Sequence, residues 1–496
     1  MVGIAVKFGD FEKAETELLA VFVSEERLKE LKKSGGFFSA LNAALPKKGF
    51  EGKAGEAFLI PNSGVPKIKN VFLLGLGKRK ELSLEKLRRA SATVARACMG
   101  LGIETPSVAF PDENFGEGKG RELQAITEGA ILGHYSFDKY ITEDAKDKSS
   151  VKTLTIVMNS GDRGAAARAV RETSIVCKNV CLVRDMVNES PWQKNTDSFS
   201  RQVKALAKKA RVSCRELSQK ELAKQGLNLV LAVGRGAEFP PRMLILEYNG
   251  NKSKKDKIAL VGKGVTFDTG GLDIKTRDMK DMKLDMGGAA TMFGAVKSLA
   301  ELKAKVNVVA VLPIVENAVG TKSYKPGSII KSYSGKTVEV ADTDAEGRLI
   351  LADALAFTSK KIKPKLIVDA ATLTGSCIGT FDEFVAGMVS NNDKFSEKMF
   401  NVGQELFERV WRMPLYDEFK DQTKSDVADV RNLGKSPYAD MTVAAGFLEK
   451  FVGKTPWIHL DIAGTAFNEK APKHYSPVGA TGFGVRLLTQ FVQENA

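Results

Sequence analysis

The feature that most constrains the fold is an alternation of short apolar runs with helical patterns in the second half of the chain. Four runs have the continuous apolar composition of strands buried on both faces, at 257–262, 306–315, 366–373 and 457–462. Helical patterns at 289–302 and 349–360 lie between them. Strands and helices in this order predict a largely parallel sheet that helices cover on both faces. In such sheets, functional sites form on the loops that leave the carboxyl ends of strands.

The first 165 residues have the pattern of a separate, smaller α/β unit. Its expected strands are at 17–23, 57–60, 71–76 and 153–158, with helices at 84–99 and 122–132 between them. A long helical pattern at about 164–187 follows. We therefore predict an α/β protein in which an N-terminal α/β domain, residues 1–165, is linked by this helix to a larger α/β domain, residues 166–496, with a mainly parallel central sheet.

Composition narrows the chemistry that such a fold can carry. The chain of 496 residues has only three histidines, so a metal site would have to depend on carboxylates. Its five cysteines are odd in number, scattered and free of CxxC spacing, as in reduced thiols of a cytosolic protein. The N-terminus lacks the pattern of a signal peptide, and no run of 18 apolar residues occurs. We expect a cytoplasmic protein with no membrane partner.

An acidic stretch at residues 342–349 is the first candidate site. Asp344, Glu346 and Arg348 alternate with the small residues Ala345 and Gly347, and an apolar run follows. If the stretch is extended, the two acids and the arginine point to the same face. Two carboxylates beside an arginine suit a hard cation and an anionic partner. The alternative interpretation is a solvated turn that precedes a helix.

A second cluster follows the apolar run at 257–262. This glycine-rich stretch contains Asp268 and Asp285 together with Lys263 and Lys275. If both clusters converge, four carboxylates meet, and they must be neutralised or repel one another. Two divalent cations would balance their charge, as in many two-metal hydrolases. The alternative is that the two lysines pair with the acids in a structural network, and the residues alone leave both interpretations open.

Together the two clusters resemble the leucyl aminopeptidase family, the two-metal cytosol aminopeptidases. The resemblance covers about residues 180–490 and is weaker over the first 165. Its motifs occur in order as VGKG at 261–264, FDTGG at 267–271, DMGGAA at 285–290, TDAEGRL at 343–349, ATLTG at 371–375, HLDIAG at 459–464 and GATGFGVR at 479–486. The resemblance implies a metal-dependent enzyme that removes the N-terminal residue, leucine or another mainly apolar one, from peptides by means of a two-metal-activated water.

The resemblance also implies roles for individual residues. It assigns two divalent ions, Mn²⁺ or Zn²⁺, to five ligands: Lys263, Asp268, Asp285, Asp344 and Glu346. Lys263 would bind as the neutral amine, which requires a lowered pKa that nearby metal charge can supply. Lys275 would stabilise the oxyanion that develops on the scissile carbonyl. Arg348 would hold a bicarbonate ion that accepts a proton from the attacking water.

Substrate-binding positions follow from the same resemblance. They are Met282, Thr372, Leu373, Gly375, Ala463 and Ala466. The small Ala466 is expected to widen the pocket for the N-terminal side chain and so favour bulky residues. Two positions depart from the family pattern: Asp342 stands where asparagine is usual, and Thr276 replaces a common proline. Neither departure removes a predicted ligand.

Partners are the last expectation. The resemblance implies peptide substrates and a homo-oligomer, a hexamer whose active sites face an interior cavity. The formal net charge of +14 permits a second interpretation, a bifunctional DNA-binding regulator with an aminopeptidase fold. The basic run at 204–211 is the candidate nucleic-acid contact, although no recognised DNA-binding motif contains it.

Overall fold

The computed structural model describes residues 2–33, 37, 41, 50–143, 150–469 and 474–496. Within these ranges the chain forms two compact units, Met1–Lys178 with Ala471–Pro477, and Asn179–Lys470 with Val478–Ala496. The long helix α5 (Arg163–Asn188) begins in the first unit and continues into the second. The domain division at residue 165 stays a prediction.

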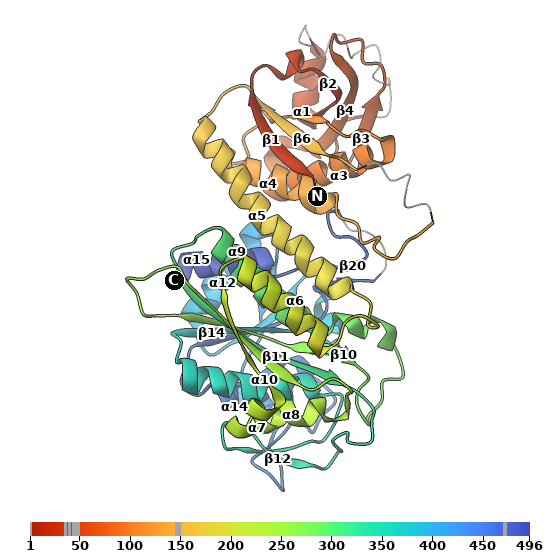
Figure 1. Ribbon diagram of the computed structural model, residues 1–496. Helices are drawn as coiled ribbons and strands as arrows, with labels where there is room; N and C mark the ends of the chain where they lie inside the picture. Colours follow the sequence, from red (N-terminus) through yellow and green to blue (C-terminus); the bar gives the residue numbers. More distant parts are fainter. Residues whose placement is uncertain (1, 34–36, 38–40, 42–49, 144–149, 470–473) are drawn as a thin grey trace. The chain divides into compact units, whose positions relative to one another are not determined.

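The first unit, whose strands are coloured red to orange in Figure 1, contains a six-stranded sheet in the order β1-β6-β5-β2-β4-β3. Every neighbouring pair is parallel except β3 and β4. Its strands are β1 (Gly3–Phe8), β2 (Thr16–Ser24), β3 (Ala57–Ile60), β4 (Ile68–Gly77), β5 (Ser107–Ala109) and β6 (Thr153–Met158), and its helices are α1 (Glu25–Lys33), α3 (Leu84–Leu101) and α4 (Lys119–Gly133). The four predicted strands and two predicted helices all occur, whereas β1, β5 and α1 were not predicted.

The second unit is built on a nine-stranded sheet in the order β16-β15-β18-β14-β9-β11-β8-β7, with β10 paired to β11. The central strands β18, β14, β9 and β11 run parallel, while β7, β8 and β15 are antiparallel to their inner neighbours. The strands are β7 (Ser213–Leu217), β8 (Arg242–Asn249), β9 (Ile258–Gly262), β10 (Gly264–Asp268), β11 (Asn307–Asn317), β14 (Leu366–Ala371), β15 (Ala386–Ser390), β16 (Val410–Arg412) and β18 (Trp457–Asp461).

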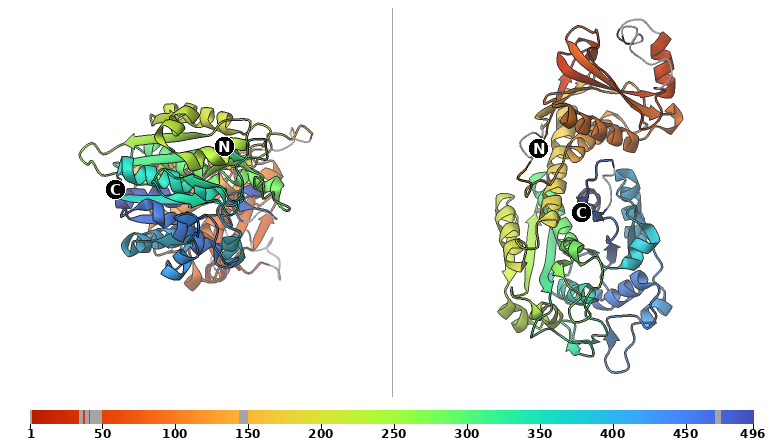
Figure 2. Two further views of the ribbon diagram at one scale, coloured as in Figure 1. Left: turned by 90° about the horizontal axis from the view of Figure 1, so that it is seen from below. Right: turned by 90° about the vertical axis from the view of Figure 1, so that its right-hand side faces the viewer.

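Helices cover both faces of this sheet (Figure 2). Successive side chains of a strand point to opposite faces, and Ala259 and Val261 of β9 share one apolar core with Leu351 and Phe447. On the other face α9 packs against β9, β11 and β14. The helices are α6 (Thr196–Lys209), α7 (Gln219–Gln225), α8 (Asn228–Val233), α9 (Gly287–Glu301), α10 (Glu346–Phe357), α11 (Gly375–Phe381), α12 (Asp393–Leu406), α13 (Asp417–Asp421), α14 (Asp440–Val452) and α15 (Val485–Asn495).

Two short sheets complete the second unit. One joins β12 (Ile329–Lys331), β13 (Thr337–Glu339) and β17 (Val430–Arg431), and the other joins β19 (Phe467–Asn468) and β20 (Gly479–Ala480). No helix in the part of the chain that the structure describes is both long and apolar enough to cross a bilayer. The predicted fold class, an N-terminal α/β domain and a larger α/β domain with a mainly parallel sheet, is confirmed.

One local prediction is wrong. Asp344, Glu346 and Arg348 do not alternate along an extended strand, because α10 begins at Glu346, three residues before the predicted helix. Glu346 and Arg348 therefore lie in the first turn of a helix. A carboxylate is favourable at that position, where the helix leaves backbone N–H groups without partners.

Candidate metal centre

The carboxyl ends of the parallel strands bring the two acidic clusters to one edge of the large sheet. Lys263 follows β9, Asp268 is the last residue of β10, Asn317 is the last residue of β11, and Thr372 follows β14. Parallel strands end at the same edge, so residues distant in sequence become neighbours there. This is the arrangement that the strand pattern predicted.

Two helices begin at this edge and supply further carboxylates. Asp285 lies two residues before the start of α9, and Glu346 is the first residue of α10. Gly347 allows Lys263 to reach Glu346, since a Cβ at position 347 would lie 2.7 Å from the Lys263 Nζ atom and 2.5 Å from its Cε atom. The glycine of the acidic motif is thus required by a close approach within the site.

Lys263 occupies the deeper part of the cluster. Its Nζ atom lies 2.7 Å from Asp285 Oδ1 and 2.9 Å from Glu346 Oε1, and it donates to the Thr372 carbonyl oxygen at 2.9 Å. The Thr372 hydroxyl donates to Asp285 Oδ1 at 2.7 Å. Lys263, Asp285 and Glu346 are all almost completely buried.

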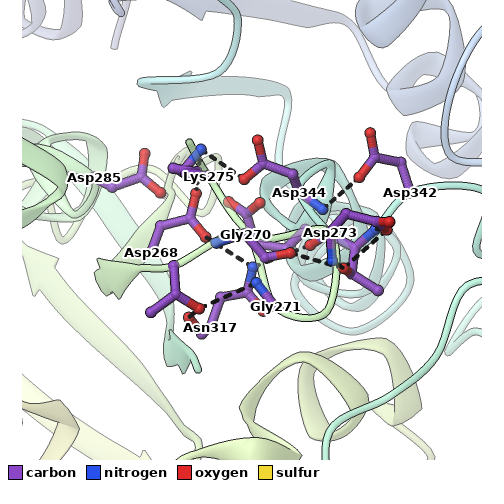
Figure 3. A network of polar contacts seen from close by, with 12 residues as sticks. Asp268, Gly270, Gly271, Asp273, Lys275, Asp285, Asn317, Asp342 and Asp344 are labelled. Carbon is purple, nitrogen blue, oxygen red and sulfur yellow. Dashed lines mark hydrogen bonds and ion pairs between the residues drawn. The ribbon is translucent and has the colours of Figure 1, made fainter. Parts of the chain in front are cut away.

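Lys275 lies nearer the solvent. Its Nζ atom is 2.9 Å from Asp268 Oδ2 and 2.6 Å from Asp344 Oδ1 (Figure 3). Carboxylate oxygens of Asp268, Asp344 and Glu346 all lie within 4.8 Å of one another, which is close enough for one cation to contact all three. The structure therefore brings together all five predicted ligands and the predicted catalytic lysine.

The two lysines do not neutralise the cluster. Two ammonium groups face four carboxylates, and Asp285 Oδ2 and Glu346 Oε2 are buried with no hydrogen-bond partner among the described residues. Burial and neighbouring negative charge raise the pKa of Asp285 and Glu346, and raise that of Asp344 to about 7. The site thus carries an excess of negative charge that further cations would offset.

The same carboxylates raise the pKa of Lys263, whereas a neutral amine ligand needs a lowered pKa. Burial alone would lower the pKa of Lys263, but Asp285, Glu346 and Asp268 outweigh burial and raise it. With these acids as its counterions among the described residues, Lys263 is therefore an ammonium ion. It would have to lose a proton to coordinate a metal, and metal charge favours that loss.

Asn317 links the two ligand-bearing segments. Its amide nitrogen donates to Asp268 Oδ1 at 2.8 Å and to the Thr343 carbonyl oxygen at 3.0 Å. The backbone N–H of Gly270 also donates to Asp268 Oδ1, at 2.9 Å (Figure 3). Gly270 has φ +88°, and a Cβ there would lie 3.0 Å from Asp344 Oδ1, so glycine is required for both reasons.

The acids that are not predicted ligands brace the loops. Asp273 Oδ2 accepts from the backbone N–H of Thr343 at 2.8 Å and from its hydroxyl at 3.0 Å. Asp342 Oδ1 accepts from the backbone N–H of Asp344 at 2.7 Å. Asp342, at the position where asparagine is usual, thus makes the contact of a turn acceptor, which an asparagine oxygen could also make.

Arg348 is buried and turned toward the segment that leads into α14. Its Nη1 atom donates to the Asn432 carbonyl oxygen and its Nη2 atom to Asp440 Oδ2, both at 2.9 Å. Its Nε atom has no partner within the described ranges. Sequence analysis missed Asn432 and Asp440 as neighbours of the site.

A cavity of about 570 Å³ opens beside the cluster. Lys263, Asp268, Lys275, Asp285 and Asp344 line it, as do Thr276 and five of the six predicted substrate-binding residues, Met282, Thr372, Leu373, Gly375 and Ala463. Ala466 is buried and is not among the residues that line the cavity. The carboxylates, the predicted catalytic lysine and this cavity therefore adjoin one another.

The chain is similar in sequence to proteins of one known family. The sequence profile of the cytosol aminopeptidase family, catalytic domain, matches residues 181–489, and that of the N-terminal domain of the same family matches residues 19–144. A probable cytosol aminopeptidase of Cenarchaeum symbiosum (strain A) is 39% identical over 99% of both chains. Another, of Aquifex aeolicus (strain VF5), is 37% identical over 98% of this chain and 97% of the relative.

Solved structures give the same result. A mutant of tomato leucine aminopeptidase matches with a TM-score of 0.88 and 29% identity, over 100% of this chain and 97% of that one. The bottromycin maturation enzyme BotP in complex with Mn matches with a TM-score of 0.86 and 29% identity, over 97% and 99%.

Proposed function

The chain belongs to the cytosol aminopeptidase family and is an aminopeptidase-type hydrolase, and from this premise we propose that it removes leucine and other mainly apolar N-terminal residues from peptides with the help of two divalent metal ions. The observation that carries the proposal is the convergence of four carboxylates and two lysines beside a cavity. The proposed metal ligands are Lys263, Asp268, Asp285, Asp344 and Glu346.

The residues present fit such a pair of cations. Carboxylate oxygens are the donors that hard divalent ions prefer. Two buried oxygens, Asp285 Oδ2 and Glu346 Oε2, have no hydrogen-bond partner among the described residues, and the cluster has a net negative charge. Bound Mn²⁺ or Zn²⁺ would give these two oxygens a partner and would offset the net negative charge. When bound, two such ions would lower the pKa of a water molecule and anchor the free amino group of the substrate.

The protein's own groups complete the proposed reaction. The Lys275 ammonium lines the cavity and can donate to the oxygen of the scissile carbonyl as negative charge develops there. The Thr372 hydroxyl orients Asp285, and Asn317 orients Asp268. Since only an N-terminal residue offers a free amine to the acidic cluster, the arrangement favours exopeptidase action.

The lining of the cavity supports an apolar N-terminal side chain. Met282, Leu284, Leu373, Ala463 and Phe467 all contribute to it, so leucine would bury apolar surface on binding. The preference for bulky side chains through Ala466, the hexamer with interior active sites and the cytoplasmic location stay predictions from the sequence.

Bicarbonate at Arg348 does not fit the structure as directly as the metals do. The guanidinium already donates to Asn432 and Asp440, and only its Nε atom lacks a partner in the described part of the chain. We therefore assign no reaction step to that ion.

Removal of metal provides the first test. We expect dialysis against a chelator to abolish hydrolysis of Leu-p-nitroanilide, and added Mn²⁺ or Zn²⁺ to restore it, because the water and the substrate amine both depend on the ions. N-acetyl-Leu-p-nitroanilide is the matched control, and it should not be hydrolysed because its amine is blocked. Undiminished activity after chelation would contradict the proposal.

Asn317 provides a test of how the ligands are supported. An Asn317→Ala variant is expected to bind Mn²⁺ about 10- to 100-fold more weakly, because Asp268 and the Thr343 carbonyl lose a shared donor. Titration calorimetry would measure the affinity. Asn307→Ala is the matched control. Asn307 lies at the opposite end of β11 and also donates to two backbone carbonyl oxygens. Equal weakening in both variants would point to general destabilisation.

A further inference from the structure

The guanidinium of Arg348 has one side that is only half occupied. Nη2 and Nε point to the same side of an arginine, where they can hold both oxygens of a planar anion. In this structure Nη2 donates to a single oxygen of Asp440, while the buried Nε atom has no hydrogen-bond partner among the described residues. Arg348 itself is only 2% exposed, so the unused donor is not satisfied by bulk water.

Other contacts hold both partners of the Arg348–Asp440 ion pair in place. Asp440 is the first residue of α14, where a negative charge interacts favourably with the N-terminal end of the helix. The next residue, Met441, donates its backbone N–H to the Ser376 hydroxyl at 2.8 Å. On the other side, Arg348 is fixed by the Asn432 carbonyl, and the amide nitrogen of Asn432 donates to the carbonyl oxygens of Asp342 and Ala345.

A second acid, Asp342, is connected to the same arginine through Asn432. The Asn432 carbonyl oxygen accepts from Arg348 Nη1, and the Asn432 amide group hydrogen-bonds to the backbone of Asp342. An additional anion at Arg348 would therefore meet Asp440 directly and Asp342 nearby. One guanidinium charge cannot neutralise three anions at once.

We propose that Asp440 is a built-in carboxylate ligand of Arg348 that excludes free planar oxyanions such as bicarbonate from the guanidinium. This inference rests on the proposed function only in placing Arg348 beside the metal ligand Glu346. Because Asp440 is part of the chain, its carboxylate has a high local concentration beside Nη2, 2.9 Å away in this structure, whereas a dissolved anion must displace it. The enzyme therefore works without added bicarbonate, and loss of the Asp440 carboxylate opens an anion site.

Calorimetric titration of sodium bicarbonate into the metal-loaded enzyme tests the proposal. The Asp440→Ala variant is expected to bind bicarbonate about 10- to 100-fold more tightly than the wild type, the range of one charge-assisted hydrogen bond. Asp440→Asn, which keeps the shape of the side chain but not its charge, is expected to change in the same direction. Sodium chloride serves as the salt control.

Asp393→Ala is the matched control variant. Asp393 is also the first residue of a helix, α12, and also pairs with an arginine, Arg412, but at an exposed position. It should leave bicarbonate affinity unchanged. The rate of Leu-p-nitroanilide hydrolysis by the wild type in buffer free of carbon dioxide should not rise when bicarbonate is added, whereas the rate of Asp440→Ala should respond.

The outcomes separate this inference from the proposed function. If chelation abolishes activity but the wild type and both Asp440 variants bind bicarbonate with equal affinity, the role of Asp440 is overturned and the metal proposal stands. A wild type whose activity rises several-fold with bicarbonate also overturns it. Activity that survives chelation contradicts the metal proposal, while tighter anion binding by Asp440→Ala would still support the role of Asp440.

Discussion

A Glu346→Ala variant is expected to hydrolyse Leu-p-nitroanilide with kcat/KM lowered by about a thousandfold or more. Glu346 is 1% exposed and pairs with Lys263 at 2.9 Å, so its loss removes one predicted ligand and leaves a buried lysine with one counterion fewer. Metal ions in hydrolases contribute several kcal/mol of transition-state stabilisation, which corresponds to losses of this size. Steady-state kinetics together with metal content by mass spectrometry would measure the effect.

The control for this variant should also leave a buried lysine without its acid. Glu301→Ala does so, because Glu301 pairs with the buried Lys297 at 2.7 Å within α9. It should retain both activity and metal. A Glu346→Ala enzyme with near wild-type kcat/KM and full metal content would refute the assignment of Glu346 as a ligand.

Replacing Lys275 with methionine is expected to lower kcat about 100- to 1000-fold while KM changes little, the usual effect of removing one donor to a developing oxyanion. Methionine keeps the length of the side chain but not its charge. Because Lys275 pairs with Asp268 and Asp344, its loss leaves these carboxylates more available to cations, so metal content should be retained.

Lys280→Met is the matched control, since Lys280 is an exposed lysine in the short 3-10 helix, Met279–Leu284, that follows the loop of Lys275. It should have wild-type kinetics. If Lys275→Met instead raised KM and left kcat unchanged, Lys275 would contribute to substrate binding but not to the chemical step. If it lost its metal, the lysine would be a structural counterion of the cluster.

Much of the large sheet could be predicted from the sequence, because its central strands are buried on both faces. Continuous apolar runs such as those of β9, β11 and β14 are typical of parallel strands that helices cover on both sides. Once parallel strands are expected, the loops after them must share one edge, so Lys263 and Thr372 could be placed together without coordinates. The antiparallel strands β7 and β8 at the other end of the sheet have weaker patterns and were not predicted.

The local structure of the acidic motif could not be predicted in the same way. The helix was predicted from its apolar run, which begins only at Leu349, whereas α10 begins at Glu346. In the folded protein the close approach of Lys263 also requires glycine at position 347. An apolar pattern carries no information about that tertiary contact.

The supporting polar residues were missed for a related reason. Asn317, Asn432 and Asp440 belong to no acidic cluster, and each acquires its role only from groups distant in the sequence. A signal existed for Asn317, a polar residue at the carboxyl end of a buried strand. None existed for Asp440, whose arginine partner is 92 positions away in the chain.

Because the site forms from separate segments that meet at one sheet edge, cation binding also stabilises the folded state of the chain. Lys263, Asp285 and Glu346 meet only when the strands and helices between them are in place. An unfolded chain has no such site, so bound cations shift the folding equilibrium toward the native state in proportion to their free concentration and affinity. Cells starved of the metal would therefore lose enzyme molecules to proteolysis as well as the activity of each molecule.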